Sequence, residues 1–275
     1  MSSLEHTSLI IIGGAEDKKK DMTILKKVCS EIDAEKDEMV IATVATELPE
    51  NVGKQYVDIF KSLGIKKISV LNINSRQDAY NQNNLKMIEN ASLIFFTGGD
   101  QLRITSNIGG TPLYNRFLEK HINKCIFVGT SAGASVMSDT MIIEGPDEES
   151  PRKCTLKMAP GLGLIKDVLI DQHFAQRGRI GRLLVGIAEN PQSLGVGIDE
   201  DTAIVVDESN KFSVIGSGAV YIVDGGGISR SNVSEQHPSE ILSIFNVKMH
   251  VLKSGDYYDI NMRMPFENEA DSNNS

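Results

Sequence analysis

The first half of the chain alternates short apolar runs with amphipathic segments. Five apolar runs have the length and content of buried strands, and they cover residues 9–12, 39–44, 68–73, 92–96 and 125–128. The segments between them carry apolar residues at helical spacing and predict helices over residues 18–30, 52–63, 76–89 and 112–121. Short strands that alternate with helices are typical of a parallel sheet with helices on both faces. We therefore predict an α/β fold with a mostly parallel central sheet.

The pattern changes in the second half of the chain. Further strands are predicted at 168–170, 194–198 and 202–206, and a helix over 175–189. From Phe212 onward, strand-like runs with frequent glycines predict a β-rich C-terminal part. No repeat and no clean linker divides the chain. We predict one α/β domain over residues 1–275, flavodoxin-like or class I glutamine-amidotransferase-like, whose polar end (267–275) is disordered.

Composition narrows the class of protein. With 40% hydrophobic and 24% charged residues, the chain has the balance of a soluble globular protein, and no apolar run approaches the roughly 20 residues that span a bilayer. The N-terminus lacks the basic segment of a signal peptide. Three dispersed cysteines without a Cys-x-x-Cys pair indicate reduced thiols, with no disulfide framework. We expect a cytoplasmic protein without membrane contact, and the net charge of −9 argues against nucleic acid as the main partner.

A candidate nucleophile follows the strand predicted at 125–128. The next residues, Gly129-Thr130-Ser131-Ala132-Gly133, match the Gly-x-Ser-x-Gly pattern of a nucleophile elbow. A serine on a sharp strand-to-helix turn needs neighbours with almost no side chain, because the backbone is crowded there. On this pattern alone, a glycine-rich connection with an incidental serine explains the residues equally well.

A serine nucleophile needs a base, which is almost always histidine. Four of the five histidines lie in a terminal segment, at a helix end, in a polar loop or within a strand; these are His6, His121, His237 and His250. His173 instead follows a short apolar strand and precedes a helix, so we predict that it is the base. The alternative is that His173 is a histidine at the end of a strand whose side chain forms a hydrogen bond with the backbone.

The carboxylate that would orient the base stays open at this point. Asp171 is too close to His173 in sequence to orient it easily. Asp199 and Glu200 both follow the apolar run 195–198, and the residues alone do not choose between them. Neither a His-x-x-x-His pair nor a compact ligand cluster is present, and Gly13-Gly14 lacks the spaced glycine of a dinucleotide fingerprint. We expect no metal and no cofactor.

Several separated stretches, in this order along the chain, resemble the cyanophycinase family of serine peptidases, a group that also includes aspartyl dipeptidases. They are 13–17 (GGAED), 96–101 (FTGGDQ), 129–133 (GTSAG), 150–152 (SPR), 160–163 (PGLG), 171–183 (DQHFAQRGRIGRL) and 197–203 (GIDEDTA). The resemblance implies that Ser131 is the nucleophile, His173 the base and Glu200 the acid. The order Ser…His…Glu differs from the Ser…Asp…His order of α/β-hydrolases.

The resemblance also implies a substrate. Cyanophycin is a polyaspartate (multi-L-arginyl-poly-L-aspartate) with arginine joined to each aspartate side chain, and the family releases β-Asp-Arg dipeptides from it by exo-cleavage through an acyl-enzyme. The N–H groups of Gly99 and Ala132 would form the oxyanion hole. A homodimer is implied as well. The rivals are an aspartyl dipeptidase or isopeptidase acting on short, β-linked acidic peptides, and a non-catalytic ligand-binding member.

Charged side chains near these motifs suit such a zwitterionic substrate. Arginine forks on the predicted helix could bind carboxylate groups; they belong to Arg177, Arg179 and Arg182. Acidic and amide groups could bind guanidinium or the amine terminus; they belong to Asp100, Gln101, Asp171 and Gln172. The alternative for the arginines is ion pairing at the surface.

Overall fold

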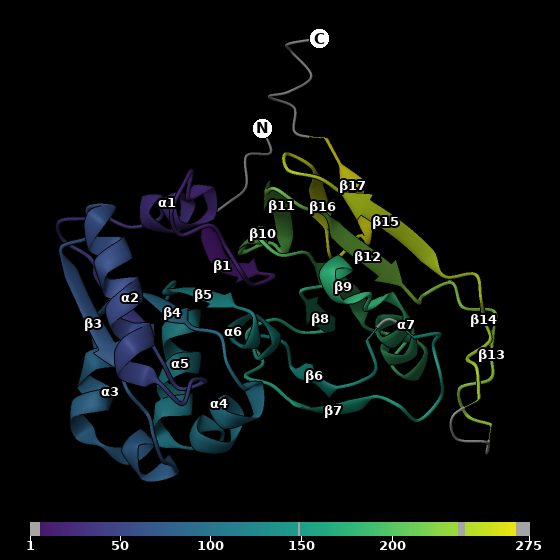
Figure 1. Ribbon diagram of the computed structural model, residues 1–275, viewed down its shortest axis with the longest axis horizontal. Coiled ribbons are helices and arrows are strands. Elements are labelled where there is room, and N and C mark those ends of the chain that lie inside the picture. The colour runs from purple at the N-terminus through teal and green to yellow at the C-terminus, as the bar shows by residue number, and fades with distance from the viewer. Residues whose placement is uncertain (1–5, 148, 236–239, 268–275) are drawn as a thin grey trace.

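A nine-stranded mixed sheet runs through the computed structural model, which describes residues 6–147, 149–235 and 240–267 (Figure 1). Its strands, in sheet order, are β17 (Met264–Phe266), β16 (Tyr257–Asp259), β11 (Lys211–Gly216), β10 (Thr202–Asp207), β1 (Thr7–Ile12), β5 (Ile126–Thr130), β4 (Ala91–Phe96), β2 (Glu38–Ala42) and β3 (Lys67–Leu71). The run from β1 to β3 is parallel, whereas β10, β11, β16 and β17 extend the sheet by antiparallel pairing. The predicted α/β class, with parallel strands flanked by helices, is confirmed.

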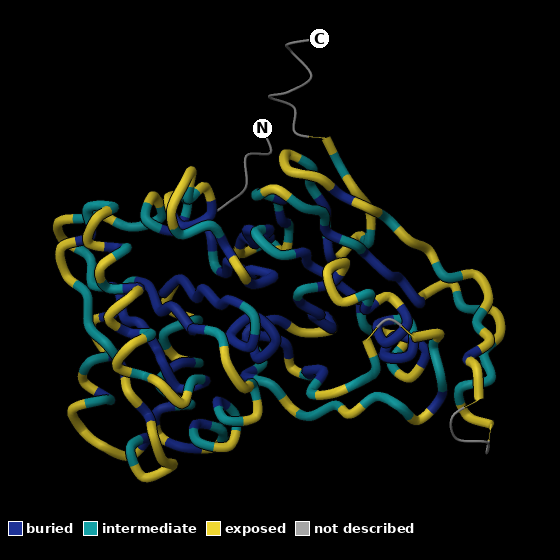
Figure 2. Tube along the Cα trace, in the orientation of Figure 1, coloured by how far each residue is buried: buried dark blue, intermediate teal, exposed yellow. Residues whose placement is uncertain are grey.

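Helices cover both faces of the parallel half. One face carries α1 (Thr23–Ser30) and α2 (Pro49–Ser62); the other carries α3 (Gln82–Glu89), α4 (Gln101–Ile108) and α5 (Pro112–Ile122). Strand alternation explains this, because Ile10 and Ile12 join the core under α1 and α2 while Leu9 and Ile11 join the core on the opposite face. Figure 2 shows the resulting dark-blue sheet between partly exposed helices. Burial of each of these aliphatic side chains stabilises the folded state by about 1.5–3 kcal/mol relative to leaving it exposed to water.

A second sheet packs against the antiparallel side of the first. Its order is β15 (Lys248–Leu252), β12 (Val220–Asp224), β9 (Leu194–Ile198) and β8 (Val168–Gln172). Val196 and Ile222 on its inner face share one core with Val206 of the large sheet. Its outer face is covered by α7 (Ile180–Glu189), where Leu183 joins a core with Leu169 and Val223. The strands predicted at 168–170 and 194–198 therefore belong to a sheet that sequence patterning did not distinguish from the first.

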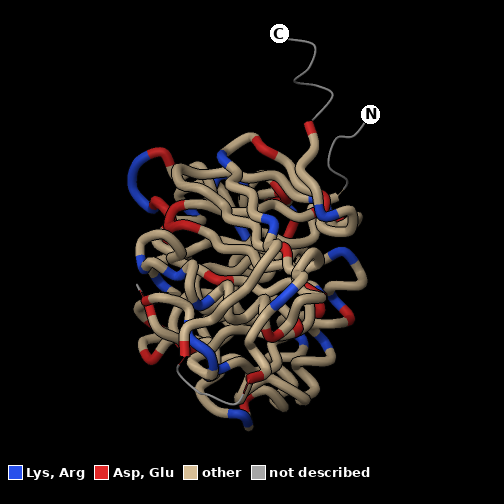
Figure 3. The backbone as a smooth tube through the Cα atoms, turned by 90° about the vertical axis from the view of Figure 1, so that its right-hand side faces the viewer, with Lys and Arg blue, Asp and Glu red and all other residues tan. Residues whose placement is uncertain are grey.

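Two short strand pairs complete the described part of the chain. They are β6 (Thr140–Glu144) with β7 (Lys157–Pro160), and β13 (Arg230–Ser231) with β14 (Ile244–Phe245). Lys and Arg are interspersed with Asp and Glu along the chain on the side seen in Figure 3. Within residues 6–147, 149–235 and 240–267, no helix combines the length and apolarity needed to cross a bilayer. The single domain stays a prediction; His237 and residues 268–275 of the predicted tail lie outside the described residues.

Local polar contacts move several predicted helix boundaries. The helix predicted from residue 18 begins at Thr23, because the Asp17 carboxylate accepts the N–H groups of Met22, Lys19 and Lys20. Those bonds lower the pKa of Asp17 to about 2. The predicted helix 76–89 divides at Asn81 into a 3₁₀ turn, η1 (Arg76–Tyr80), and α3. The helix predicted over 175–189 divides at Gly178 into a second 3₁₀ turn, η2 (Ala175–Arg177), and α7. The sequence pattern did not predict α4.

Candidate active site

Ser131 occupies a sharp turn between β5 and the short helix α6 (Ala132–Ser135). Its φ of 54° and ψ of −112° are unfavourable for a residue with a side chain, so the surrounding structure must hold them. The turn is crowded as the motif predicts: a Cβ on Gly129 would lie 2.2 Å from the Gly133 carbonyl oxygen, and one on Gly133 would lie 2.4 Å from that of Phe96. The two glycines are therefore required by close backbone approach.

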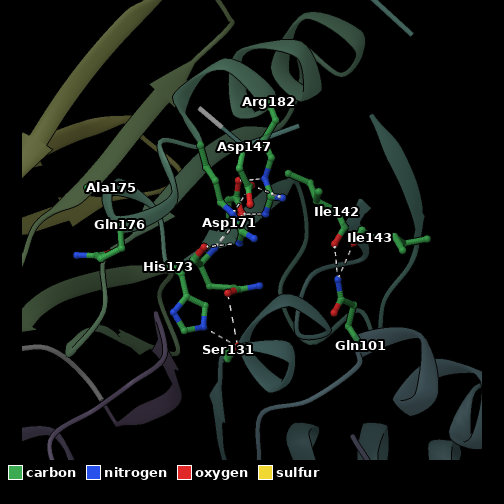
Figure 4. A network of polar contacts seen from close by, with 12 residues as sticks. Gln101, Ser131, Ile142, Ile143, Asp147, Asp171, His173, Ala175, Gln176 and Arg182 are labelled. Carbon is green, nitrogen blue, oxygen red and sulfur yellow. Dashed lines mark hydrogen bonds and ion pairs between the residues drawn. The ribbon is translucent and has the colours of Figure 1, made fainter. Parts of the chain in front are cut away.

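The three side chains predicted as nucleophile, base and acid form one chain of contacts. Ser131 Oγ lies 2.9 Å from His173 Nε2, and His173 Nδ1 lies 2.6 Å from Glu200 Oε1. Figure 4 shows the first of these contacts, with the His173 ring directed at Ser131. The His173 side chain is 13% exposed and that of Glu200 is 38% exposed, so the ring is shielded while the carboxylate remains partly hydrated. This arrangement fits proton transfer from Ser131 to His173.

The loops that carry the three side chains come from two sheets and contact one segment, residues 12–14, at the end of β1. Ser131 follows β5 of the large sheet, whereas His173 and Glu200 follow β8 and β9 of the second sheet. Three successive carbonyl groups each accept one backbone N–H from these loops: Ile12 from Ser131 (3.1 Å), Gly13 from His173 (2.9 Å) and Gly14 from Asp201 (2.9 Å). The donors all have positive φ, at 54°, 49° and 49° respectively. The segment therefore holds three unfavourable backbone conformations in register with one another.

The environment of His173 favours the neutral ring. Burial is the largest influence and lowers its pKa from the ordinary 6.5, while the hydrogen bond to Glu200 raises the pKa and the positive charge of Arg177 lowers it. The net direction is downward. A neutral imidazole at pH 7 is able to accept the proton of Ser131.

The geometry favours Glu200 over Asp199 as the orienting carboxylate. Asp199 is 5% exposed, and its carboxylate accepts the N–H groups of Ala175 (2.9 Å) and Ala219 (3.1 Å). It thus connects the loop after His173 to the start of β12. Asp171 is directed away from the ring, toward Arg182. The catalytic roles themselves stay predictions.

The predicted oxyanion donors belong to the two turns that adjoin Ser131. Ala132 follows Ser131 at the start of α6. The Gly98-Gly99 turn follows β4, and a Cβ on Gly98 would lie 3.4 Å from Ser131 Cβ. Gly99 has a φ of 145°, and a Cβ there would lie 2.2 Å from the Ala45 carbonyl oxygen, so glycine alone fits. The role of the Gly99 and Ala132 N–H groups stays a prediction.

A charge cluster of three buried side chains and one partly exposed carboxylate lies beside His173 (Figure 4). Arg179 and Arg182 are 5% and 7% exposed, so they are not the surface ion pairs that the sequence left open. Arg182 donates through Nε (2.7 Å) and Nη2 to the Asp171 carboxylate, which is itself 1% exposed. Both guanidinium groups also reach Asp147 Oδ1, at 2.9 Å from Arg179 Nε and 3.3 Å from Arg182 Nη1. Two positive and two negative charges are thereby brought together.

The other predicted substrate-binding residues have diverse surroundings. Gln172 Oε1 lies 3.5 Å from Ser131 Oγ. Gln101 Nε2 donates to the carbonyl groups of Ile142 and Ile143, both at 3.1 Å, so it fixes the path of β6. Asp100 caps α4 by accepting the Leu102 N–H at 2.8 Å. Arg177 is exposed. Substrate contact stays a prediction for all seven residues.

Asp147 was not predicted as a site residue, and its only signal in the sequence is its place in an acidic loop. Glu16, which is 3% exposed and accepts the Thr130 hydroxyl, was not predicted either. Among the residues that the structure describes, no three His, Cys, Asp or Glu side chains are grouped as metal ligands would be.

Comparison with known proteins identifies relatives over nearly the whole chain. Residues 9–214 match the model of peptidase family S51. The chain is 37% identical to a cyanophycinase of Synechococcus elongatus over 257 residues, which cover 93% of this chain and 80% of that protein. It is 36% identical to a cyanophycinase of Geminocystis herdmanii over 266 residues, which cover 96% and 98%. The crystal structure of a peptidase from an acI-B1 actinobacterium has the same fold, with a TM-score of 0.63 and 22% identity over 91% of this chain and 96% of that one.

The close approach of Gly14 to the His173 ring predicts the effect of a single methyl group. A Cβ at Gly14 would lie 2.4 Å from His173 Cε1, so Gly14→Ala displaces the ring from Ser131. We expect the reaction of Ser131 with a fluorophosphonate to slow about 100-fold, the loss typical of a misplacement near 1 Å. Gly64→Ala is the matched control, because Gly64 has a similar φ (103° against 100°) and nothing within 4 Å of its Cβ position. Equal rates for both variants would contradict the contact.

The pKa of His173 predicts the pH dependence of the same reaction. The rate should fall on acidification with a midpoint below 6.5, because a protonated ring cannot accept the Ser131 proton. Glu200→Gln should lower the midpoint further and slow the reaction, since Glu200 raises the ring pKa. Asp199→Asn is the control and should shift the midpoint less. A midpoint above 6.5, or a larger shift in Asp199→Asn, would contradict this assignment.

Proposed function

Because the chain belongs to peptidase family S51 and is a serine peptidase, we propose that it is a cyanophycinase that releases β-Asp-Arg dipeptides from cyanophycin. The observation that carries the proposal is the contact chain from Ser131 through His173 to Glu200, in a protein that is 36% identical to a cyanophycinase over 96% of its length. The homodimer and the cytoplasmic location expected from the sequence stay predictions.

The proposed reaction passes through an acyl-enzyme. Ser131 Oγ attacks a backbone carbonyl carbon of the polyaspartate while His173 Nε2 accepts its proton, and Glu200 stabilises the charged ring. The N–H groups of Gly99 and Ala132 stabilise the oxyanion, and the loss of one such donor typically costs about 100–1000-fold in rate. The C–N bond then breaks and the leaving amine takes the proton from His173. Water, deprotonated by the same ring, attacks the ester and regenerates Ser131.

The charges near Ser131 suit a β-Asp-Arg unit, which carries both carboxylate and guanidinium groups. Arg177 is exposed and close enough to His173 to lower the ring pKa, so it is available to a substrate carboxylate. In the charge cluster beside His173, the Asp147 side chain is 40% exposed while those of its arginine partners are 5% and 6% exposed. A substrate carboxylate that replaced Asp147 would therefore find two oriented guanidinium groups and leave the cluster electrically balanced.

The first test of the proposal is the loss of Ser131 Oγ. Ser131→Ala should release no β-Asp-Arg above background from insoluble cyanophycin, as measured by chromatography of the supernatant, because the covalent step is removed. Ser135→Ala is the matched control, since it removes a hydroxyl from the last residue of α6, the short helix that Ser131 precedes. Full activity of Ser131→Ala would rule out the serine mechanism. Wild-type cleavage of Asp-X dipeptides with no release from the polymer would instead identify an aspartyl dipeptidase.

The exchange of Asp147 for a substrate carboxylate predicts a change in KM. Asp147→Asn removes the competing charge, so KM for a short cyanophycin oligomer should fall about two- to fivefold, the range that partly exposed ion pairs support. Glu149→Gln removes a charge from the same loop and is the matched control. A KM that rises in Asp147→Asn would show that Asp147 holds the loop in place for the substrate and does not compete with it.

A further inference from the structure

Glu16 is a buried carboxylate that takes no part in the reaction described above. It is 3% exposed and follows the segment whose carbonyl groups hold the loops of Ser131, His173 and Glu200. Three cationic or hydroxyl groups surround it: Tyr56 Oη donates to Oε1 at 2.5 Å, Thr130 Oγ1 donates to Oε2 at 2.6 Å, and Lys18 Nζ lies 2.9 Å from Oε1. A buried carboxylate without such partners would cost several kcal/mol. The three partners therefore offset the cost of burying the Glu16 carboxylate.

These partners connect three elements around the site. Thr130 is the last residue of β5 and directly precedes Ser131. Tyr56 lies on α2, where it is 4% exposed and packs against Phe95 of β4. Lys18 lies over the Tyr56 ring, 5.1 Å from its centroid, and is part of the same loop as Glu16. Glu16 thus joins the loop after β1 both to the residue before Ser131 and to the helix layer.

The backbone conformation of Ser131 depends on the contacts that hold its neighbours, including the contact between Glu16 and Thr130. An unfavourable φ/ψ pair costs on the order of 1–3 kcal/mol and persists only where its neighbours hold it. The Ser131 N–H is held by the Ile12 carbonyl, and Thr130, on the other side of the same peptide, is held by Glu16. Gly14, two residues before Glu16, lies against the His173 ring. A displacement of this loop would therefore move both partners of the 2.9 Å Ser131–His173 contact.

We propose that Glu16 is a positioning residue, which holds Ser131 and His173 in reactive alignment through Thr130 and the Gly13-Gly14 segment. The proposal rests on the catalytic role proposed for Ser131. Glu16 touches neither the substrate nor the reacting atoms, so its loss should lower kcat while KM stays nearly unchanged. Carboxylate–hydroxyl bonds are among the stronger hydrogen bonds in proteins, which suits this role.

The test removes the Glu16–Thr130 contact from each side. Thr130→Val keeps the shape and the β-branching that suit a strand, and Glu16→Gln keeps the length of the side chain. We expect kcat for a cyanophycin oligomer to fall about 10–100-fold in each variant, with KM within about twofold of the wild type. In the double variant kcat should fall no further than in Glu16→Gln alone, because both substitutions remove the same Glu16–Thr130 hydrogen bond. Glu38→Gln is the control: Glu38 also accepts a hydroxyl, from Ser69 at 2.7 Å, but between β2 and β3 at the far edge of the sheet.

The rate at which a fluorophosphonate labels Ser131 is measured in parallel, because it reports on alignment without the peptide substrate. It should fall in step with kcat in Thr130→Val and Glu16→Gln, and stay at the wild-type value in Glu38→Gln. Wild-type kcat in Thr130→Val, additive losses in the double variant, or an equal loss in Glu38→Gln would each overturn the proposal. If the wild type is labelled but leaves cyanophycin intact, the proposed substrate is wrong, and the labelling rates alone still decide the role of Glu16.

Discussion

Three successive carbonyl groups at the end of β1 are the constraint on which the site depends. They bind the backbone N–H groups of Ser131, His173 and Asp201, which come from loops of two different sheets. Each of these residues has a positive φ that a free chain would avoid. β1 lies at the junction between the parallel and antiparallel halves of the large sheet, beside both β5 and β10. The segment after β1 is therefore the place where one set of hydrogen bonds can align all three loops.

Such an alignment requires a segment almost without side chains. A Cβ on Gly13 would lie 2.0 Å from the Asp199 carbonyl oxygen, and one on Gly14 would overlap the His173 ring. Glycine at these two positions therefore allows the segment to lie directly against the loop that carries Glu200 and against the His173 ring. The same compactness buries His173 and lowers its pKa, so the packing that positions the ring also keeps it neutral.

Local chemistry determined what could be predicted from the sequence. The parallel strands were predictable because apolar runs alternate with amphipathic helices. The Ser131 turn was predictable because a crowded strand-to-helix turn requires glycines next to the serine. Contacts between residues far apart in the sequence, and the sheet to which each strand belongs, could not be predicted from the sequence. Nothing in the apolar run 168–170 distinguishes a strand of the second sheet from a strand of the first, since residues 126–128 of the first sheet are also apolar and fully buried. Asp147 and Glu16 gain their roles from partners more than 30 residues away, and the helix after Asp100 was hidden by its polar composition.

Hydrogen exchange of three backbone amides tests the central claim most directly. If the carbonyl groups of Ile12, Gly13 and Gly14 hold the site together, the amides of Ser131, His173 and Asp201 should exchange as slowly as those in the centre of β1, because they open only when that sheet opens. The measurement is made by NMR on the intact protein at neutral pH. Exchange of any of the three at the rate of an exposed loop, while β1 remains protected, would contradict the account.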